Sequence, residues 1–321
     1  MSISMPVIEE FINFAAQIKR YMNDNNKVAG HIACFTAYAI FGVNIILCKD
    51  LTGGHLISPM AIFTLRSIGA GGLFWLLSTL LPREKIENKD YIKIFAASIL
   101  GFFICQITFL IALPEVTPMD CSILAAMSPI YTMFIAAIAL KEPITLKKVG
   151  GVLLSLAGVL LLILNSISLR TAGQNSTIQG LIIMIFNGLS FSLYLGLFKP
   201  LINKYSVVTF MKWIFLFAAA ISIPFSAKEI VTLQWSTIPN VQLWELTYLI
   251  VCATFVSYFL IPFGQRRIRP TLVSMYSYIQ PIVAIGISII IGMETFTWQK
   301  VLAAVMVFCG VIIVSQSKSK M

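Results

Sequence analysis

Polar side chains inside long apolar stretches are the residues of this sequence best equipped to bind a ligand. A hydroxyl or amide is costly in such surroundings unless it faces a cavity or a polar partner. Amides both donate and accept hydrogen bonds, and tyrosines combine an apolar ring with a polar tip. Groups of this kind also form hydrogen bonds between membrane helices. For each residue, ligand binding and helix association are both considered. The candidates for ligand binding are Asn44, Gln106, Ser128, Tyr131, Asn187, Tyr194, Tyr258, Tyr276 and Gln280.

Arg66 is the one charged residue deep inside an apolar stretch, at 58–81. In a helix it lies roughly 10 Å below the nearer end of that stretch, and its long stem can cover part of this distance. We expect Arg66 to be a structural charge that pairs with carbonyls or hydroxyls; contact with a ligand is the alternative. With no second cation at this depth, a fully anionic ligand is not expected.

Two prolines lie near the middle of apolar stretches, Pro129 and Pro281. Each removes one backbone donor and frees the carbonyl four residues earlier, at Ala125 and Ser277. We expect a kink at each proline that serves as a hinge or exposes an acceptor. A kink that only shapes packing is the alternative.

The composition explains why these residues must lie in a membrane. Of 321 residues, 58% are hydrophobic and 11% are charged, against about 25% charged in an ordinary soluble domain; the mean hydropathy is +0.90. Soluble, disordered and disulfide-scaffold proteins are excluded. The six cysteines show no C-x-x-C pairing and no adjacent His, so we expect neither a metal site nor a cofactor.

A membrane core of about 30 Å needs roughly 20 apolar residues in a helix. The expected fold is all-α, with ten transmembrane helices. Residues 1–28 form a polar extension with apolar residues at helical spacing, expected as an amphipathic surface helix or a frayed tail. The ten predicted spans are 29–48, 58–81, 91–113, 119–140, 148–165, 178–198, 208–225, 243–263, 270–292 and 298–315.

The positive charges predict the orientation of these spans. Eighteen Lys and Arg residues fall on one side, four fall on the other, and Arg66 lies within a span. Because positive loops stay in the cytoplasm, both termini are expected there. The net charge of +10 therefore marks a membrane face, and no nucleic-acid partner is expected. We expect the inner (plasma) membrane, with the bilayer as partner.

The sequence contains an internal duplication. A shift of 152 residues aligns 118–163 with 270–315 without a gap, with twelve of 46 positions identical. Two units are predicted, 29–165 and 178–315, each with five spans. Because five is odd, the second unit enters the membrane from the opposite side. Inverted repeats of this kind are typical of transporters that open a midplane site to alternate sides.

Short motifs in the two units resemble the EamA type of the drug/metabolite transporter superfamily. The resemblance implies a ten-helix bundle with a cavity lined by spans 1, 3, 4, 6, 8 and 9. It also implies peripheral spans 5 and 10, which often serve packing or homodimer contacts, and export of amino acids, drugs, sugars or other metabolites. The motifs are Leu65-Arg66, Ser128-Pro129, Lys141-Glu142-Pro143-Ile144-Thr145, Gly150-Gly151, Gly158-Val159, Gln280-Pro281, Gly292-Met293-Glu294-Thr295-Phe296-Thr297 and Gly310-Val311.

The function expected from these features is export of a small polar or amphipathic metabolite, such as an amino acid, by alternating access. The middle third of each span lacks Asp, Glu, Lys and His, whereas proton-driven carriers usually place a relay there. A facilitator or exchanger is therefore expected, with coupling through Asp120 or Glu245 as the alternative. The other classes considered are an intramembrane enzyme and a membrane scaffold or receptor. Among transporters, a sugar or drug carrier is the alternative.

Overall fold

The computed structural model describes residues 27–53, 57–116, 124–125, 127–167, 177–290 and 297–317. Most of the predicted extension 1–28 and the carboxylate of Asp120 lie outside these residues.

The described part of the chain is helical and contains no strand. Where the predicted ranges fall on described residues, these residues are largely helical. The elements are α2 (Lys27–Gly53), α3 (Pro59–Thr79), α4 (Asn88–Ser98), η1 (Ile99–Ile104), α5 (Cys105–Ala112), α7 (Ser128–Ala139), α8 (Leu146–Ile167), α9 (Ile178–Leu197), α10 (Lys199–Lys204), α11 (Val207–Thr232), η2 (Trp235–Thr237), α12 (Asn240–Tyr248), η3 (Leu249–Val256), α13 (Ser257–Arg267), α14 (Pro270–Met275), η4 (Tyr276–Tyr278), α15 (Ile279–Ile290) and α16 (Trp298–Ser315).

Several helices are long and apolar enough to cross a bilayer. Among the described residues there are six: α2, α3, the continuous run α4–η1–α5, α9, α11, and the run α12–η3–α13. Two shorter apolar helices lie at Ser128–Ala139 and Val301–Ser315. The chain is therefore a multi-pass integral membrane protein.

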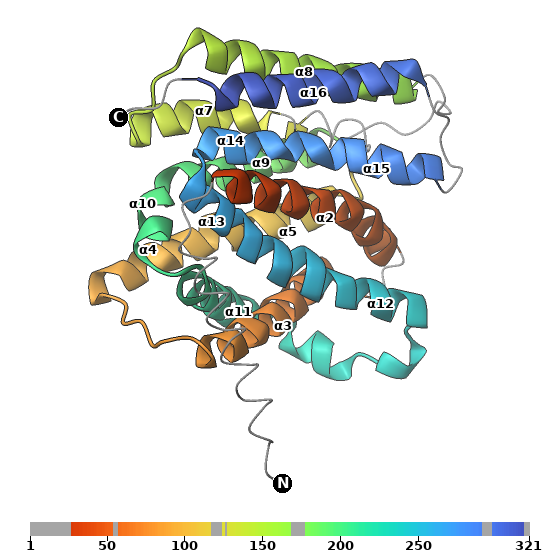
Figure 1. The fold of residues 1–321 in the computed structure, drawn as a ribbon. Helices are drawn as coiled ribbons and strands as arrows, with labels where there is room; N and C mark the ends of the chain where they lie inside the picture. The colour runs from red at the N-terminus through yellow and green to blue at the C-terminus, as the bar shows by residue number, and fades with distance from the viewer. Residues whose placement is uncertain are drawn as a thin grey trace, which may run out of the picture.

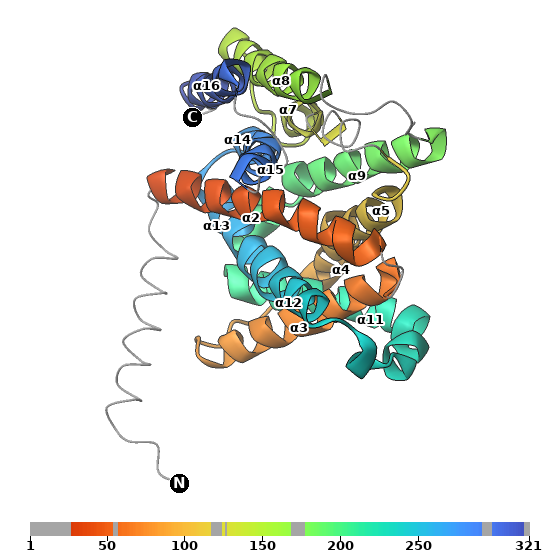
Figure 2. The same cartoon turned by 90° about the vertical axis from the view of Figure 1, so that its right-hand side faces the viewer.

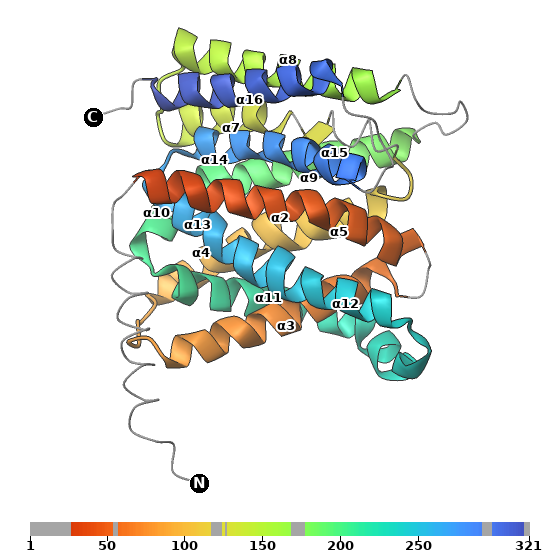
Figure 3. The ribbon, with the colours of Figure 1, turned by 45° about the vertical axis from the view of Figure 1, so that its right-hand side comes forward.

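The helices pack in a pattern that repeats when the two halves are exchanged. Helix α2 of the first half contacts α13 and α15 of the second, and α9 of the second half contacts α5 and α7 of the first. Helix α3 packs against α11, and α8 packs against α16. The pair α8–α16 forms one edge of the bundle, while α3 and α11 lie toward the opposite edge (Figure 1, Figure 2 and Figure 3).

Helices α3 and α11 begin with matching serine caps. The Ser58 Oγ accepts from the Ala61 N–H at 3.2 Å, and the Ser206 Oγ accepts from the Thr209 N–H at 3.2 Å. Each serine also donates to a carboxylate near the opposite end of its partner helix: Glu229 lies in the last turn of α11, and Glu84 lies in the segment that follows α3. The hydroxyl of Ser58 donates to Glu229 at 2.5 Å, and the hydroxyl of Ser206 donates to Glu84 at 2.7 Å. The two helices are thus fastened at both ends.

Small residues bring α8 and α16 into close contact. A Cβ placed on Gly310 would lie 2.1 Å from the Ser155 Oγ and 2.4 Å from the Gly151 carbonyl oxygen. The Ser155 Oγ donates to the Val307 carbonyl at 3.1 Å. Glycine and serine permit this backbone approach, which is how membrane helices associate without a hydrophobic driving force.

Both prolines lie within the first three residues of a helical element. Their role as hinges stays a prediction. Pro129 occupies the first turn of α7, and Pro281 is the third residue of α15, directly after the 3₁₀ segment η4. The first turn tolerates proline because its N–H groups have no intrahelical acceptor. The chain therefore changes helical geometry at matched positions in the two halves.

Candidate functional site

A hydrogen bond between Gln106 and Tyr258 joins the two halves in the interior. The Gln106 Nε2 on α5 donates to the Tyr258 hydroxyl on α13 at 2.8 Å. The two residues are 152 positions apart, the offset that also aligns 118–163 with 270–315, and each is the second residue of its α-helix. Both are buried, and the Gln106 Oε1 has no hydrogen-bond partner in the described part of the structure. An acceptor is therefore available where equivalent positions meet.

Tyr38 and Tyr194 complete what we call the central cluster, defined as Tyr38, Gln106, Tyr194 and Tyr258. The ring of Phe41 lies 5.9 Å from the ring of Tyr38 on α2 and 6.0 Å from that of Tyr258. The ring of Tyr194 on α9 packs against Gly101, whose neighbour Phe102 contacts the Tyr258 ring. Tyr38 and Tyr194 are 1% and 2% exposed, and neither hydroxyl has a partner among the described residues. Buried hydroxyls are nearly always satisfied in proteins. Unmatched hydroxyls at the junction of four helices are thus candidates for contact with a ligand.

Aromatic rings enclose the Tyr258 side of this cluster. The ring of Tyr258 lies 6.0 Å from Phe41, 4.9 Å from Phe102 and 5.7 Å from Phe215, all centroid to centroid. Each contact is edge-on, the arrangement that aromatic pairs favour. The polar groups of the cluster are therefore bordered by apolar rings.

Matched π-helical segments lie next to the cluster. The segment η1 begins at Ile99 and η3 begins at Leu249, 150 residues later. A Cβ on Gly101 in η1 would lie 2.3 Å from the Tyr194 ring, so glycine permits this tyrosine to pack against the backbone. Segments of π-helix occur often at functional sites. Here they lie on the helices that supply Gln106 and Tyr258.

Three other predicted binding residues have hydrogen-bond partners, two of them on a neighbouring helix. The Ser128 Oγ lies 3.1 Å from the Ser192 Oγ, linking α7 to α9. The Asn187 Nδ2 donates to the Cys105 carbonyl, linking α9 to α5. The Asn44 Oδ1 accepts from the Cys48 thiol at 3.5 Å within α2.

The remaining candidates lie on the helices that contain the two prolines. The Tyr276 hydroxyl lies 2.7 Å from the Nδ1 of His31 on α2. Gln280 is half-buried, and its backbone carbonyl packs against Gly42. Tyr131 is half-buried, with its ring against Gly188. Among the described residues, none of these three side chains has a hydrogen bond or ring contact with Gln106 or Tyr258.

Arg66 is fully buried and makes the expected contact with a hydroxyl. Its Nε donates to the Thr254 Oγ1 at 2.8 Å, and this hydroxyl in turn donates to the Leu249 carbonyl at 2.6 Å. The two terminal nitrogens of Arg66 have no hydrogen-bond partner in the described residues. The guanidinium therefore retains N–H donors on Nη1 and Nη2 that form no hydrogen bond with described residues.

A lysine holds the predicted cytoplasmic ends of α9 and α13 together. The Lys199 Nζ donates to the Gln265 carbonyl and, at 2.7 Å, to the Ile268 carbonyl. Loss of water around the amine lowers the pKa of Lys199 to about 8. Nearby, hydrogen bonds from Lys204 to Asp90 and Glu87 raise the pKa of Lys204 above its ordinary value.

Comparison with known proteins identifies the family. The EamA-like transporter family matches residues 28–164 and 178–316. The chain belongs to the EamA-like transporter family.

Similar proteins and a solved structure agree with this assignment. An "Uncharacterized transporter" of Archaeoglobus fulgidus is 23% identical over 82% of this chain and 91% of its own length. The "Uncharacterized transporter YyaM" of Bacillus subtilis is 24% identical over 87% of this chain and 91% of its own length. A crystal structure superposes with a TM-score of 0.70 at 16% identity, covering 90% of this chain and 97% of that one; it supports the fold. Together, family and relatives point to a transporter, not an enzyme.

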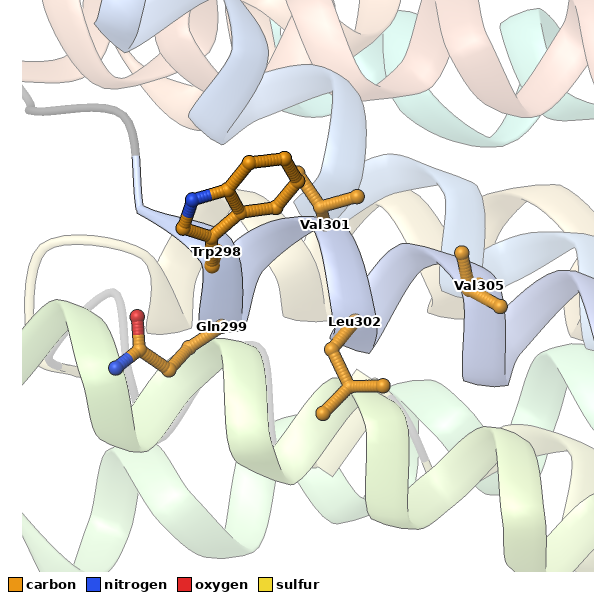
Figure 4. A pocket seen from close by; sticks show the side chains of 5 residues that line it. All are labelled: Trp298, Gln299, Val301, Leu302 and Val305. Carbon is orange, nitrogen blue, oxygen red and sulfur yellow. The ribbon is translucent and has the colours of Figure 1, made fainter.

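This EamA-like chain also has a shallow pocket on the outer face of α16 (Figure 4). Apolar side chains dominate its lining, and Trp298, Leu302 and Val305 are 79%, 55% and 50% exposed. Exposed apolar residues on a membrane helix suit contact with lipid. None of the predicted binding residues lines this pocket.

Sequence reasoning missed Tyr38 and Thr254 in this EamA-like transporter. Tyr38 lies at the centre of predicted span 29–48, so the depth criterion that selected Tyr194 also applies to it. Thr254 had no such signal, because threonine hydroxyls commonly bond to their own helix. Its contact with Arg66 depends on how α3 crosses η3.

Proposed function

We propose that this EamA-like protein is a secondary transporter that exports a small polar or amphipathic metabolite, such as an amino acid, by alternating access. The observation that carries the proposal is the Gln106–Tyr258 bond between equivalent positions of the two halves. Unmatched hydroxyls of Tyr38 and Tyr194 belong to the same cluster. A site shared by two similar halves can open to either side when the halves exchange conformations. A sugar or drug carrier is the alternative.

The proposed architecture has ten spans in two units, 29–165 and 178–315, of opposite orientation. The exchangeable packing of α2 with α13 and α15, and of α9 with α5 and α7, supports this arrangement. Both termini are proposed to lie in the cytoplasm of a cell with this protein in its inner membrane, following the positive charges. Spans 5 and 10, here α8 and α16, are proposed to be peripheral. A homodimer formed through them is a prediction.

The proposed site includes the predicted polar residues, with the central cluster at its middle. Pro129 and Pro281 are proposed as the points where span 4 and span 9 change shape between states. Transport is proposed to proceed as facilitation or exchange, because the predicted spans offer no ionisable relay at depth.

A ligand screen followed by topology mapping tests this proposal. Thermal unfolding of the purified protein against amino acids, sugars, nucleosides and cationic drugs should show a rise in melting temperature for one chemical class. Reporter fusions at the C-terminus should place that end in the cytoplasm. No stabilisation by any class would contradict a metabolite site, and a C-terminus outside the cytoplasm would contradict the topology.

A further inference from the structure

The guanidinium of Arg66 has unused hydrogen-bond donors in the membrane interior. Arg66 is 0% exposed, and only its Nε is occupied, by the Thr254 hydroxyl at 2.8 Å. Both terminal nitrogens, Nη1 and Nη2, are buried without a partner in the described residues. No described carboxylate forms an ion pair with Arg66. A buried cation is thus left with two vacant amino groups.

Arg66 lies where the helices of the proposed site meet. Its partner Thr254 on η3 lies one helical turn before Tyr258, and α3 packs against both η3 and α5, the helix that carries Gln106. The guanidinium therefore belongs to the surroundings of the central cluster, although span 2, here α3, is not among the spans that the family resemblance implies as lining the cavity.

The chemistry of arginine specifies what can satisfy these donors. A guanidinium offers five N–H donors in one plane and no acceptor. Because Nε is held by Thr254, the free edge of the fork consists of Nη1 and Nη2 side by side. Two parallel N–H groups on that edge match the two oxygens of a carboxylate, the ligand that arginine recognises through paired hydrogen bonds.

We propose that Arg66 binds the carboxylate of the transported substrate through Nη1 and Nη2. This inference rests on the proposed transport function and names the substrate class as amphipathic carboxylic acids. It reverses the expectation that the ligand is not fully anionic, because Arg66 alone offers two free donors. The free Oε1 of Gln106 accepts a donor group on the same substrate, and the rings of Phe41 and Phe102 pack beside its apolar part. The Thr254 contact then positions Arg66, so the expected structural pairing and ligand binding use different nitrogens of one side chain.

Matched pairs of small probes test the carboxylate directly. The full-length protein, purified in detergent with methanesulfonate as the background anion, is titrated with benzoate and benzamide, L-leucine and L-leucinamide, and lactate and lactamide. Thermal stabilisation gives the affinity of each probe. At least one carboxylate should bind tenfold or more tightly than its amide. Chloride and phosphate, titrated alone, should not reproduce its stabilisation.

Variants of Arg66 assign the effect to this side chain. Arg66→Gln should weaken binding of the carboxylate at least tenfold and change binding of the matching amide by less than twofold. Arg66→Lys keeps the charge without the fork and should lie between wild type and Arg66→Gln. Lys89→Gln, which removes an exposed cation, should bind as the wild type does.

Each other outcome overturns the proposal. Equal binding of carboxylate and amide, unchanged carboxylate binding in Arg66→Gln, no binding of any carboxylate, or equal stabilisation by chloride or phosphate excludes a carboxylate fork. If Arg66→Gln does not fold, the test rests on two other measurements: the ratio of carboxylate to amide affinity in the wild type, and the carboxylate affinity of Arg66→Lys. Flux in liposomes separates this proposal from the proposed function. If the transported substrate is neutral or cationic and its flux is unchanged in Arg66→Gln, the carboxylate site is excluded while the transport function stands. If a carboxylate binds but no compound is transported, the transport function is excluded while the carboxylate site stands.

Discussion

The Gln106 Nε2 and the Tyr258 hydroxyl meet at 2.8 Å across the junction of the two repeats, although 152 residues separate them in the chain. Two equivalent positions can touch only where the axis that relates the halves passes between them. A ligand bound beside this pair contacts both halves at once. The pair is therefore well placed to sense a change in the relative arrangement of the halves.

Removing either partner of this pair should impair substrate binding. Tyr258→Phe deletes the acceptor and leaves a buried Gln106 N–H without a partner, at a cost of about 1–3 kcal/mol. We expect roughly tenfold weaker binding of the substrate that the ligand screen identifies, and a similar loss in Gln106→Leu. The double variant should lose less than the sum of the single losses. Tyr91→Phe, on α4 and away from the cluster, is the control; strictly additive losses would argue against a functional pair.

The serine–glutamate contacts at the two ends of α3 and α11 should stabilise the fold to a similar degree. Ser58→Ala and Ser206→Ala each remove a helix cap and a hydrogen bond to a carboxylate, and we expect a loss of about 1–2 kcal/mol for each. Thermal unfolding in detergent measures the change. Ser78→Ala is the matched control, because the exposed Ser78 hydroxyl bonds only to its own helix, at Trp75. Melting temperatures equal to that of Ser78→Ala would show that these contacts do not fasten the pair.

Two glycines in α8 and α16 should respond very differently to alanine. Gly310→Ala places a Cβ against Ser155 and the Gly151 backbone, so we expect a loss of about 1–3 kcal/mol from overpacking. Gly150→Ala has open space around the new Cβ, and its melting temperature should match or exceed that of the wild type. Because α8 and α16 form an edge of the bundle, flux per folded molecule should be unchanged in both. Equal stabilities of the two variants would contradict the close approach of these helices.

Lys199 should make stability depend on pH above neutrality. Burial lowers the pKa of its amine from 10.5 to about 8. Between these values the unfolded chain holds a proton that the folded chain has lost, so the contribution of Lys199 to the free energy of unfolding rises with pH. From pH 7.5 to 9.5 this gain is about 2 kcal/mol. Lys199→Met should lack it, as measured by thermal unfolding at both pH values; identical pH dependence in the two proteins would contradict the assignment.

The sequence predicted the membrane class, the family and the polar residues Gln106, Tyr194 and Tyr258, because depth and polarity are visible in a single chain. It could not predict which of these polar groups would meet. Ser128 and Asn187 lie near the centres of their predicted spans, yet both bond to neighbouring helices. The rotation of each helix about its axis determines which polar side chains face a neighbouring helix. A strongly apolar stretch has little amphipathic pattern from which this rotation could be predicted.

The change of helical geometry next to each proline shows a second limit of prediction. The motif predicts a distortion at Pro129 and Pro281, but the start of α7 at Ser128 and the 3₁₀ segment before Ile279 depend on packing around them. Likewise, the terminal nitrogens of Arg66 are vacant only because α3 crosses η3 so that Thr254 meets Nε. That crossing follows from tertiary structure, for which the sequence carries no local signal.

Flux through liposomes that contain the purified protein tests the central claim most directly. Liposomes are loaded with unlabelled amino acids, carboxylic acids, sugars, nucleosides or cationic drugs, and uptake of the labelled compound is followed. We predict that at least one class exchanges faster than in protein-free liposomes, that Tyr258→Phe slows this exchange, and that Tyr91→Phe does not. Exchange at the protein-free rate for all classes, with correctly folded protein, would contradict a transporter with its site between the two halves.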